Sequence, residues 1–224
     1  MIIRLRAVAT LLLLGAGAAL GAESIVPIEQ EPQHQLKFRN QFVRLFDVVL
    51  PRGYKSQWHR HIYAGVFVNI EPSETRAQDL GGDPVDRPPR IVGDTYFIDY
   101  AQKPKVHRVD NIGASTYRVA DTEILRACGG FAPVKDGEGQ SLILENDRVR
   151  VTRVMIGPGE KLALHPPCGM LVAVTGGKLR FDGAGAEELV TFHPAGFKWR
   201  DSAAPQEFTN VGDEVFQGVD IVVK

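Results

Sequence analysis

The feature that most constrains the fold of this chain is an internal repeat. The segment 40–68 aligns without a gap with 146–174, and 107–119 aligns with 206–218 after a shorter spacer. Identical residues recur through both alignments: Asn40 with Asn146, Val43 with Val149, Arg44 with Arg150, Gly53 with Gly159, Lys55 with Lys161, His59 with His165, Asn111 with Asn210 and Gly113 with Gly212. Such a repeat predicts two similar structural units in tandem.

Both copies have the composition of β-strands. Short runs rich in valine, isoleucine and phenylalanine alternate with Pro-Gly and Gly-Gly turns, and helical periodicity is weak. The pattern predicts an all-β sandwich or barrel in each copy. A first domain is expected over 23–126 and a second over 141–224, joined by a polar linker, 127–140. The charged, proline-rich stretch 71–90 is predicted to be a long loop at one mouth of the first barrel.

The N-terminus is typical of a secretory signal peptide, residues 1–22. Arg4 and Arg6 precede an apolar block that ends in small residues, so cleavage is expected near Ala22. An uncleaved anchor is the alternative, although the block is shorter than a membrane span requires. We therefore expect a periplasmic or secreted protein with no membrane partner after cleavage.

Two cysteines, Cys128 and Cys168, are compatible with a disulfide in an oxidising compartment. Their spacing does not establish the bond. The favoured interpretation is two buried, small apolar residues.

The charge of the chain narrows the choice of partner. Its 224 residues carry a formal net charge of -1 at pH 7, and no basic run stands out. This gives no electrostatic reason to expect nucleic acid or an anionic membrane as a partner. A small-molecule substrate or ligand is the expected partner.

Two histidines one residue apart mark a candidate site. His59 and His61 begin a run that alternates polar and apolar side chains, so on a strand they share one face, which Tyr63 and Gly65 continue. A pair on one face is more often surface or core than ligand. His107, at the start of another strand-like block, raises the odds of a metal site.

These blocks resemble the cupin family, whose first motif is G-x5-H-x-H-x3,4-E-x6-G and whose second ends in H-x3-N. Gly53, His59 and His61 match the first motif at its spacing, and His107 with Asn111 matches the end of the second. The resemblance covers nearly the whole chain beyond the signal peptide, once per copy. It implies two tandem double-stranded β-helix barrels of jelly-roll type, the arrangement called a bicupin, and a homo-oligomer is compatible with it.

The resemblance also implies the metal ligands His59, His61 and His107. The glutamate of the first motif is missing, because Gly65 occupies its inward-facing position. Three neutral imidazoles can bind divalent Fe, Mn, Ni, Cu or Zn. By resemblance to three-histidine cupins, the site is expected to support dioxygenase-like oxidation, or to activate water if zinc is bound. The alternative is a periplasmic protein that binds or senses a small ligand or metal without turnover.

The second copy does not keep this ligand set. His165 takes the place of His59, but Pro167 replaces His61, Leu171 replaces the glutamate and Gln206 stands where His107 would be. The second barrel is therefore interpreted as degenerate and structural, with a dry pocket for a small apolar group as the alternative. In its FHPAGF segment, His193 is expected to be solvated.

Other residues complete the expectations for the first barrel. The candidates for lining its pocket are Tyr63, Gly65, Phe67, Tyr96 and Tyr100. His34, near the start of the first domain, is expected to be exposed. Arg44 recurs as Arg150 in a copy without a metal set, which predicts a structural role outside the site.

Overall fold

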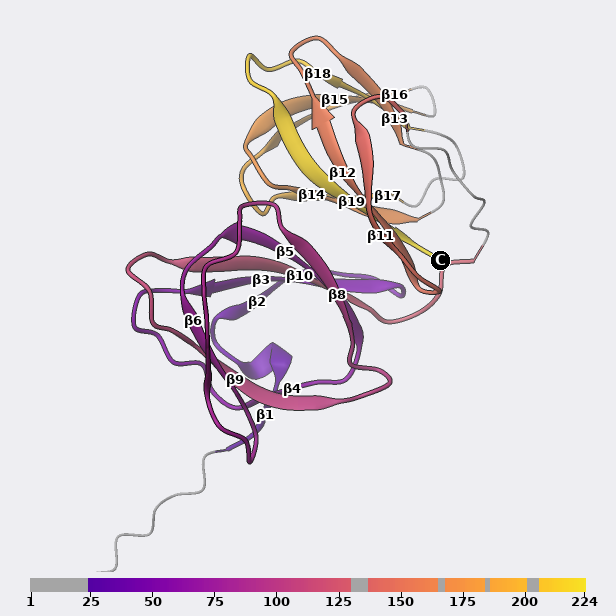
Figure 1. Cartoon of the computed structure of the whole chain (residues 1–224). Coiled ribbons are helices and arrows are strands. Elements are labelled where there is room, and N and C mark those ends of the chain that lie inside the picture. Colours follow the sequence, from indigo (N-terminus) through magenta and orange to yellow (C-terminus); the bar gives the residue numbers. More distant parts are fainter. Residues whose placement is uncertain (1–23, 130–136, 165–167, 184–185, 201–205) are drawn as a thin grey trace, which may run out of the picture.

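The computed structural model describes residues 24–129, 137–164, 168–183, 186–200 and 206–224. The predicted signal peptide, part of the predicted linker, His165 and Pro167 lie outside these ranges. The chain folds into two β-barrels that pack against each other (Figure 1). The predicted all-β, two-barrel fold is confirmed. Among the described residues, no helix is long and apolar enough to cross a membrane.

The first barrel consists of two five-stranded sheets. One sheet has the order β1 (Val26–Pro27), β4 (His59–His61), β9 (Lys105–Asn111), β6 (Thr75–Asp79) and β7 (Val85–Arg87). The other has the order β2 (His34–Arg39), β3 (Val43–Leu50), β10 (Tyr117–Ile124), β5 (Ala64–Glu71) and β8 (Thr95–Asp99). A short 3-10 helix, η1 (Ile28–Gln30), follows β1.

The second barrel repeats this plan. Its first sheet has the order β11 (Gln140–Glu145), β12 (Val149–Ile156), β19 (Phe216–Val223), β14 (Gly169–Ala173) and β17 (Phe197–Arg200). Its second has the order β13 (Lys161–Leu164), β18 (Gln206–Asn210), β15 (Gly177–Gly183) and β16 (Ala186–Phe192).

Residues that are identical in the two copies hold equivalent turns. The side-chain amide of Asn111 donates to the backbone carbonyl oxygen of Leu50 at 2.8 Å. In the second copy, that of Asn210 donates to the carbonyl oxygen of Ile156, also at 2.8 Å. Both asparagines are buried, so these bonds satisfy backbone groups that water does not reach. The repeated residues therefore maintain the same backbone geometry in both copies and do not indicate a shared site.

The stretch 71–90 differs from its prediction as a long loop. It contains β6 and β7, which pair as an antiparallel hairpin, and β6 also pairs along its length with β9. The prolines, Pro72, Pro84, Pro88 and Pro89, all lie outside these strands, so they remove no ladder hydrogen bond from the strand interiors. Charged side chains suit this hairpin because β7 is exposed and forms an edge of its sheet.

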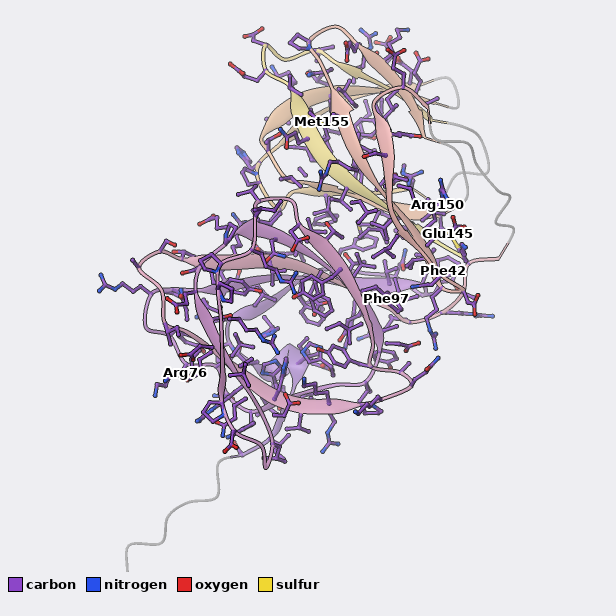
Figure 2. The ribbon with its side chains drawn as sticks, viewed as in Figure 1. Phe42, Arg76, Phe97, Glu145, Arg150 and Met155 are labelled. Atoms are coloured by element: carbon purple, nitrogen blue, oxygen red, sulfur yellow. A yellow bond between two sulfur atoms is a disulfide. The ribbon has the colours of Figure 1, made fainter. Side chains whose placement is uncertain are left out.

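The two barrels share one hydrophobic core. Strands β3, β10 and β5 of the first barrel face β12, β19 and β14 of the second (Figure 1). Valine and isoleucine from both sides fill the contact, among them Val43, Val66, Val151 and Ile221. The outer face of one sheet in each barrel is thus buried, which leaves the barrel interiors free to differ. Phe42 and Phe97 pack at the border of this core, where the barrels meet (Figure 2).

A disulfide joins Cys128 to Cys168, so the interpretation of both as unpaired apolar residues is wrong. The two Cα atoms are 6.3 Å apart, within the usual range for a disulfide. The bond connects the segment after β10 with the start of β14, which are far apart in sequence but adjacent where the barrels meet.

Removing this disulfide should destabilise the protein. It closes a loop with a sequence separation of 40 residues. A loop of that size restricts the unfolded chain, so the double variant Cys128→Ser, Cys168→Ser should lose about 2–4 kcal/mol of unfolding free energy. Urea unfolding of the oxidised protein and the double variant measures this. Equal midpoints would contradict the prediction.

Candidate metal centre

Two strands bring the three predicted histidines together inside the first barrel. His59 and His61 point inward from β4, while Arg60 between them is exposed. On β9, His107 lies directly opposite His59 in the antiparallel register. Its ring centroid is 4.6 Å from that of His59 and 5.0 Å from that of His61. The three imidazoles therefore share one side of the interior.

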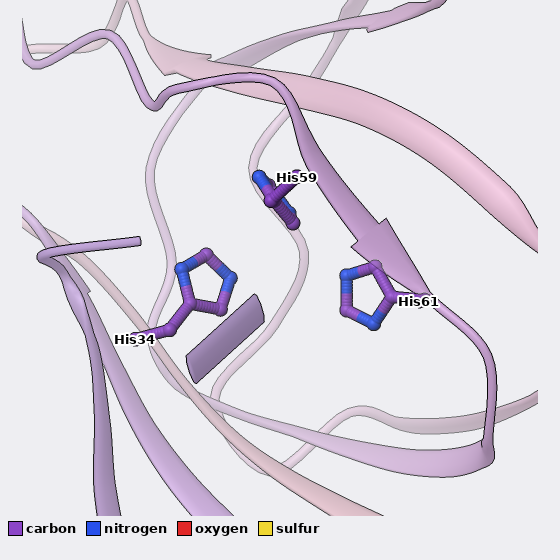
Figure 3. A group of neighbouring side chains, drawn as sticks. All are labelled: His34, His59 and His61. Carbon is purple, nitrogen blue, oxygen red and sulfur yellow. The ribbon is translucent and has the colours of Figure 1, made fainter. Parts of the chain in front are cut away.

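A fourth histidine joins this cluster, so the expectation that His34 is exposed is wrong. His34 begins β2 and is buried, with its ring centroid 4.5 Å from that of His59. The ligating atoms of His34, His59 and His61 lie within 4.8 Å of one another. Figure 3 shows His34 opposite the two histidines of β4. The polar residues around His34 hid it, because only its own side chain turns inward at the start of that strand.

The hydrogen bonds of His34 and His59 both engage the Nδ1 atom of the ring. His59 Nδ1 lies 2.9 Å from the carbonyl oxygen of Gln57, and His34 Nδ1 lies 2.6 Å from Glu31 Oε2. Since both partners accept, each ring donates from Nδ1, so a neutral ring in either position carries its lone pair on Nε2. Within the described part of the chain, the buried His59 Nε2 has no hydrogen-bond partner. Metal-binding histidines commonly have this arrangement.

Strand β10 supplies carboxylates at the position where the motif's glutamate is missing. Glu123 lies opposite Gly65 in the sheet, and its Oε1 is 3.3 Å from His61 Nδ1. Asp121, two residues earlier, shares that face and also lies 4.0 Å from His61. A Cβ atom on residue 65 would come within 3.1 Å of Asp121 Oδ1, so Gly65 leaves room for this carboxyl group. Two acidic residues at alternate positions of one strand are the sequence signal that could have indicated these carboxylates.

A cavity of about 70 Å³ lies at the cluster. All four histidines and Asp121 line it, together with Phe67, Tyr96 and Tyr100 of the predicted pocket residues. The ring of Tyr100 stacks on His61 with centroids 4.8 Å apart. Tyr63 lies in the bend between β4 and β5 and lines a different groove. The volume suits an ion with a few waters or a very small ligand.

Burial in the cavity keeps the imidazoles of His59, His61 and His107 neutral. Burial, with smaller contributions from nearby basic groups, His34 among them, lowers the pKa of His59 to about 3 and that of His61 to about 3. Burial also lowers the pKa of His107 well below its ordinary value. A neutral imidazole keeps the lone pair that a metal needs, so these histidines are ready to bind at neutral pH.

Acid should destabilise the metal-free protein through these histidines. The pKa of His59 and that of His61 are 6.5 in the unfolded chain and about 3 in the fold, so the unfolded state takes up more protons between these values. Stability is complete above pH 6.5 and is lost as the pH falls, by about 1.4 kcal/mol per pH unit for each imidazole. Urea unfolding across this range measures the slope. His61→Gln should reduce the slope by one proton, and an unchanged slope would contradict the assignment.

Arg44 lies beside the site, which corrects its predicted role outside it. Its Nε donates to Glu123, and its Nη1 donates to Glu29 Oε2 at 3.2 Å. Because Glu123 also contacts His61, Arg44 supports the histidine cluster from behind. In the second copy, Arg150 instead forms an ion pair with the exposed Glu145.

The interior of the second barrel is hydrophobic. Phe181, Phe192, Phe208 and Phe216 form its core, with Leu171 at the position of the motif's glutamate. His193 lies exposed between β16 and β17, as expected. No group of potential ligands is close enough to hold a metal in the described part of this barrel. These features agree with a degenerate second module.

Comparisons with solved structures place this architecture among known folds. The chain matches AerE from Microcystis aeruginosa with a TM-score of 0.63 and 12% identity, over 84% of this chain and 90% of that one. It matches oxalate decarboxylase from Lactobacillus farciminis with a TM-score of 0.57 and 12% identity, over 81% and 77%. A cupin 2 conserved barrel domain protein from Leptotrichia buccalis gives a TM-score of 0.50 and 12% identity, over 84% and 86%.

The chain has a bicupin fold. The sequence matches no protein-family model. No curated protein matches its sequence either. At these identities the likeness concerns the fold, while the histidine cluster is a feature of this chain's own residues.

Proposed function

We propose that this bicupin binds one divalent transition-metal ion in its first barrel and uses it to convert a small molecule. His59 and His61 are the central ligands, with His34 and His107 completing the histidine set. The observation that carries the proposal is the buried His59 Nε2, whose lone pair has no partner within the described residues. A buried polar atom without a partner costs free energy, so its retention points to a ligand.

The donor set fits the metal class. Neutral imidazoles suit Fe, Mn, Ni, Cu and Zn, whose choice depends on geometry and supply. Such an ion would provide Lewis-acid chemistry or, if redox-active, oxygen-dependent oxidation. The proposed reaction class, oxidation of dioxygenase type, rests on the resemblance to three-histidine cupins.

The carboxyl group of Asp121 is placed to take part in proton transfer. Burial raises the pKa of Asp121 well above its ordinary value, and neither carboxyl oxygen has a hydrogen-bond partner among the described residues. The group lines the cavity, so it can hold a proton beside a bound molecule. This favours catalysis over the alternative of a protein that binds or senses a ligand without turnover, which was supported by the lack of an identifiable acid or base.

Two measurements test this function. Mass spectrometry of the purified protein should find about one metal per chain and identify the element. The metal-loaded protein is then tested for turnover of thiols, diketones and catechols by oxygen uptake, and of oxalate, the substrate named for one structural neighbour, by product analysis. Metal binding without any turnover, together with a ligand that raises the melting temperature, would favour the binding protein instead. A protein that takes up no metal after reconstitution would contradict the proposal.

We further propose that the protein is exported. The disulfide between Cys128 and Cys168 supports this, because such bonds persist in oxidising compartments. Cell fractionation with sequencing of the mature N-terminus tests it. Recovery of the full-length chain in the cytoplasm would contradict it.

A further inference from the structure

A groove of about 500 Å³ shares none of its lining residues with the histidine cavity. Strand β4 contributes side chains to both spaces. His59 and His61 face the cavity, whereas Arg60 on the opposite face of the strand and Ile62 just beyond its end line the groove. Strand β1 and the helix η1, with Arg39 of β2 and Arg44 of β3, complete its walls. The volume lies in the range of small-molecule sites, about 300–1,000 Å³.

Positive charge dominates this groove. Arg39, Arg44 and Arg60 line it, against a single acid, Glu29, which already accepts from Arg44. Arg39 lies directly opposite Arg44 in the β2–β3 register, and like charges at that position repel each other. Arg39 and Arg60 are exposed and form no ion pair with any residue that the structure describes. A bound anion would relieve this repulsion.

The rest of the groove is apolar. Ile25 and Ile62 are 40% and 44% exposed, and Val26, Pro27 and Tyr63 continue the surface between them. Exposed aliphatic side chains beside arginines suit a ligand with an apolar body and a charged end. A fully hydrated inorganic anion would use only the arginines.

We propose that this groove is a second binding site, for a small carboxylate with an aromatic or alkyl body. The carboxylate binds the guanidinium groups of Arg39 and Arg60, whose planar donor sets match it. The apolar body packs on Ile25, Ile62 and Tyr63. This binding does not depend on the metal in the neighbouring cavity.

Arg44 connects the groove to the histidine cluster. Its guanidinium is buried, lies 5.0 Å from the ring centroid of Tyr63 and donates to Glu123. Glu123 Oε1 in turn lies 3.3 Å from His61 Nδ1. A carboxylate added beside Arg44 changes the charge around this chain of contacts, so occupation of the groove reaches His61 without contact with it.

The test uses 2-naphthoate as the probe and the uncharged 2-naphthamide as its matched control, on the full-length, metal-free protein. Calorimetric titration should detect 2-naphthoate, and naphthamide should bind at least about tenfold more weakly because it lacks the charge-assisted hydrogen bonds. Arg39→Gln and Arg60→Gln should each weaken naphthoate by about tenfold. Arg52→Gln, a change at an exposed arginine outside the groove, should leave it unchanged.

Three outcomes would overturn the proposal. These are no binding of 2-naphthoate up to about 10 mM, equal affinities for naphthoate and naphthamide, and equal losses in Arg60→Gln and Arg52→Gln. The imidazole nitrogen resonances of His61, recorded in the same titration, test the connection through Arg44. They should shift on binding in the wild type and not in Glu123→Gln, and naphthoate binding without that shift would overturn the connection.

Discussion

Replacing His59 with glutamine should lower the metal affinity by on the order of 100-fold or more, since loss of a partner that only orients a ligand already costs about 10–100-fold. Glutamine is neutral and similar in length, so the barrel is expected to fold. Competition with a chelator measures the affinity. His193→Gln provides the matched control, because that histidine is exposed on the second barrel and should leave binding unchanged.

The same assay separates the two histidines that flank this centre. His34→Gln and His107→Gln should each cause a loss comparable to that of His59→Gln, because both histidines belong to the proposed ligand set. Glu31→Gln should have a smaller effect, because Glu31 orients His34 through its Nδ1. Wild-type affinity in His59→Gln would contradict the proposed centre as a whole.

Much of this fold could be predicted from the sequence because its signals are local or repeat. The buried asparagines Asn111 and Asn210 stand at matching positions and make matching bonds to backbone carbonyl groups. The H-x-H spacing of His59 and His61 placed both rings on one face of a strand, whatever the rest of the chain does. These features require only the period of a strand and the geometry of a turn.

The site residues that the sequence did not predict reach the site through the pairing of strands. Glu123 replaces the absent motif glutamate from β10, and this follows only from the pairing of β10 with β5, which puts it opposite Gly65. His34 joins the cluster because β2 begins beside it. The polar residues next to His34 in the sequence do not indicate that its side chain points inward. For the hairpin of β6 and β7, proline and charge predict a loop, because the sequence does not indicate that this segment forms a sheet edge, where both are tolerated.

The second large effect is expected from replacing Arg44, which lies beside the site. Arg44→Met should destabilise the protein by about 3–5 kcal/mol at neutral pH, because it leaves the buried Glu123 without its cationic partner. Methionine keeps much of the packing of the arginine stem, so the loss reports the charge.

The pH dependence and a double variant separate this charge effect from lost packing. Burial raises the pKa of Glu123 even though Arg44 opposes the rise, and removing Arg44 should raise that pKa further. Stability of Arg44→Met should therefore be best preserved at low pH, where Glu123 is protonated, and lost as the pH rises through its folded pKa. Urea unfolding should show a larger penalty at about pH 7 than at about pH 5 and a large recovery in Arg44→Met, Glu123→Gln. A penalty that is the same at both pH values and in both variants would mean that Arg44 acts by packing, and would remove the electrostatic basis for its connection to His61.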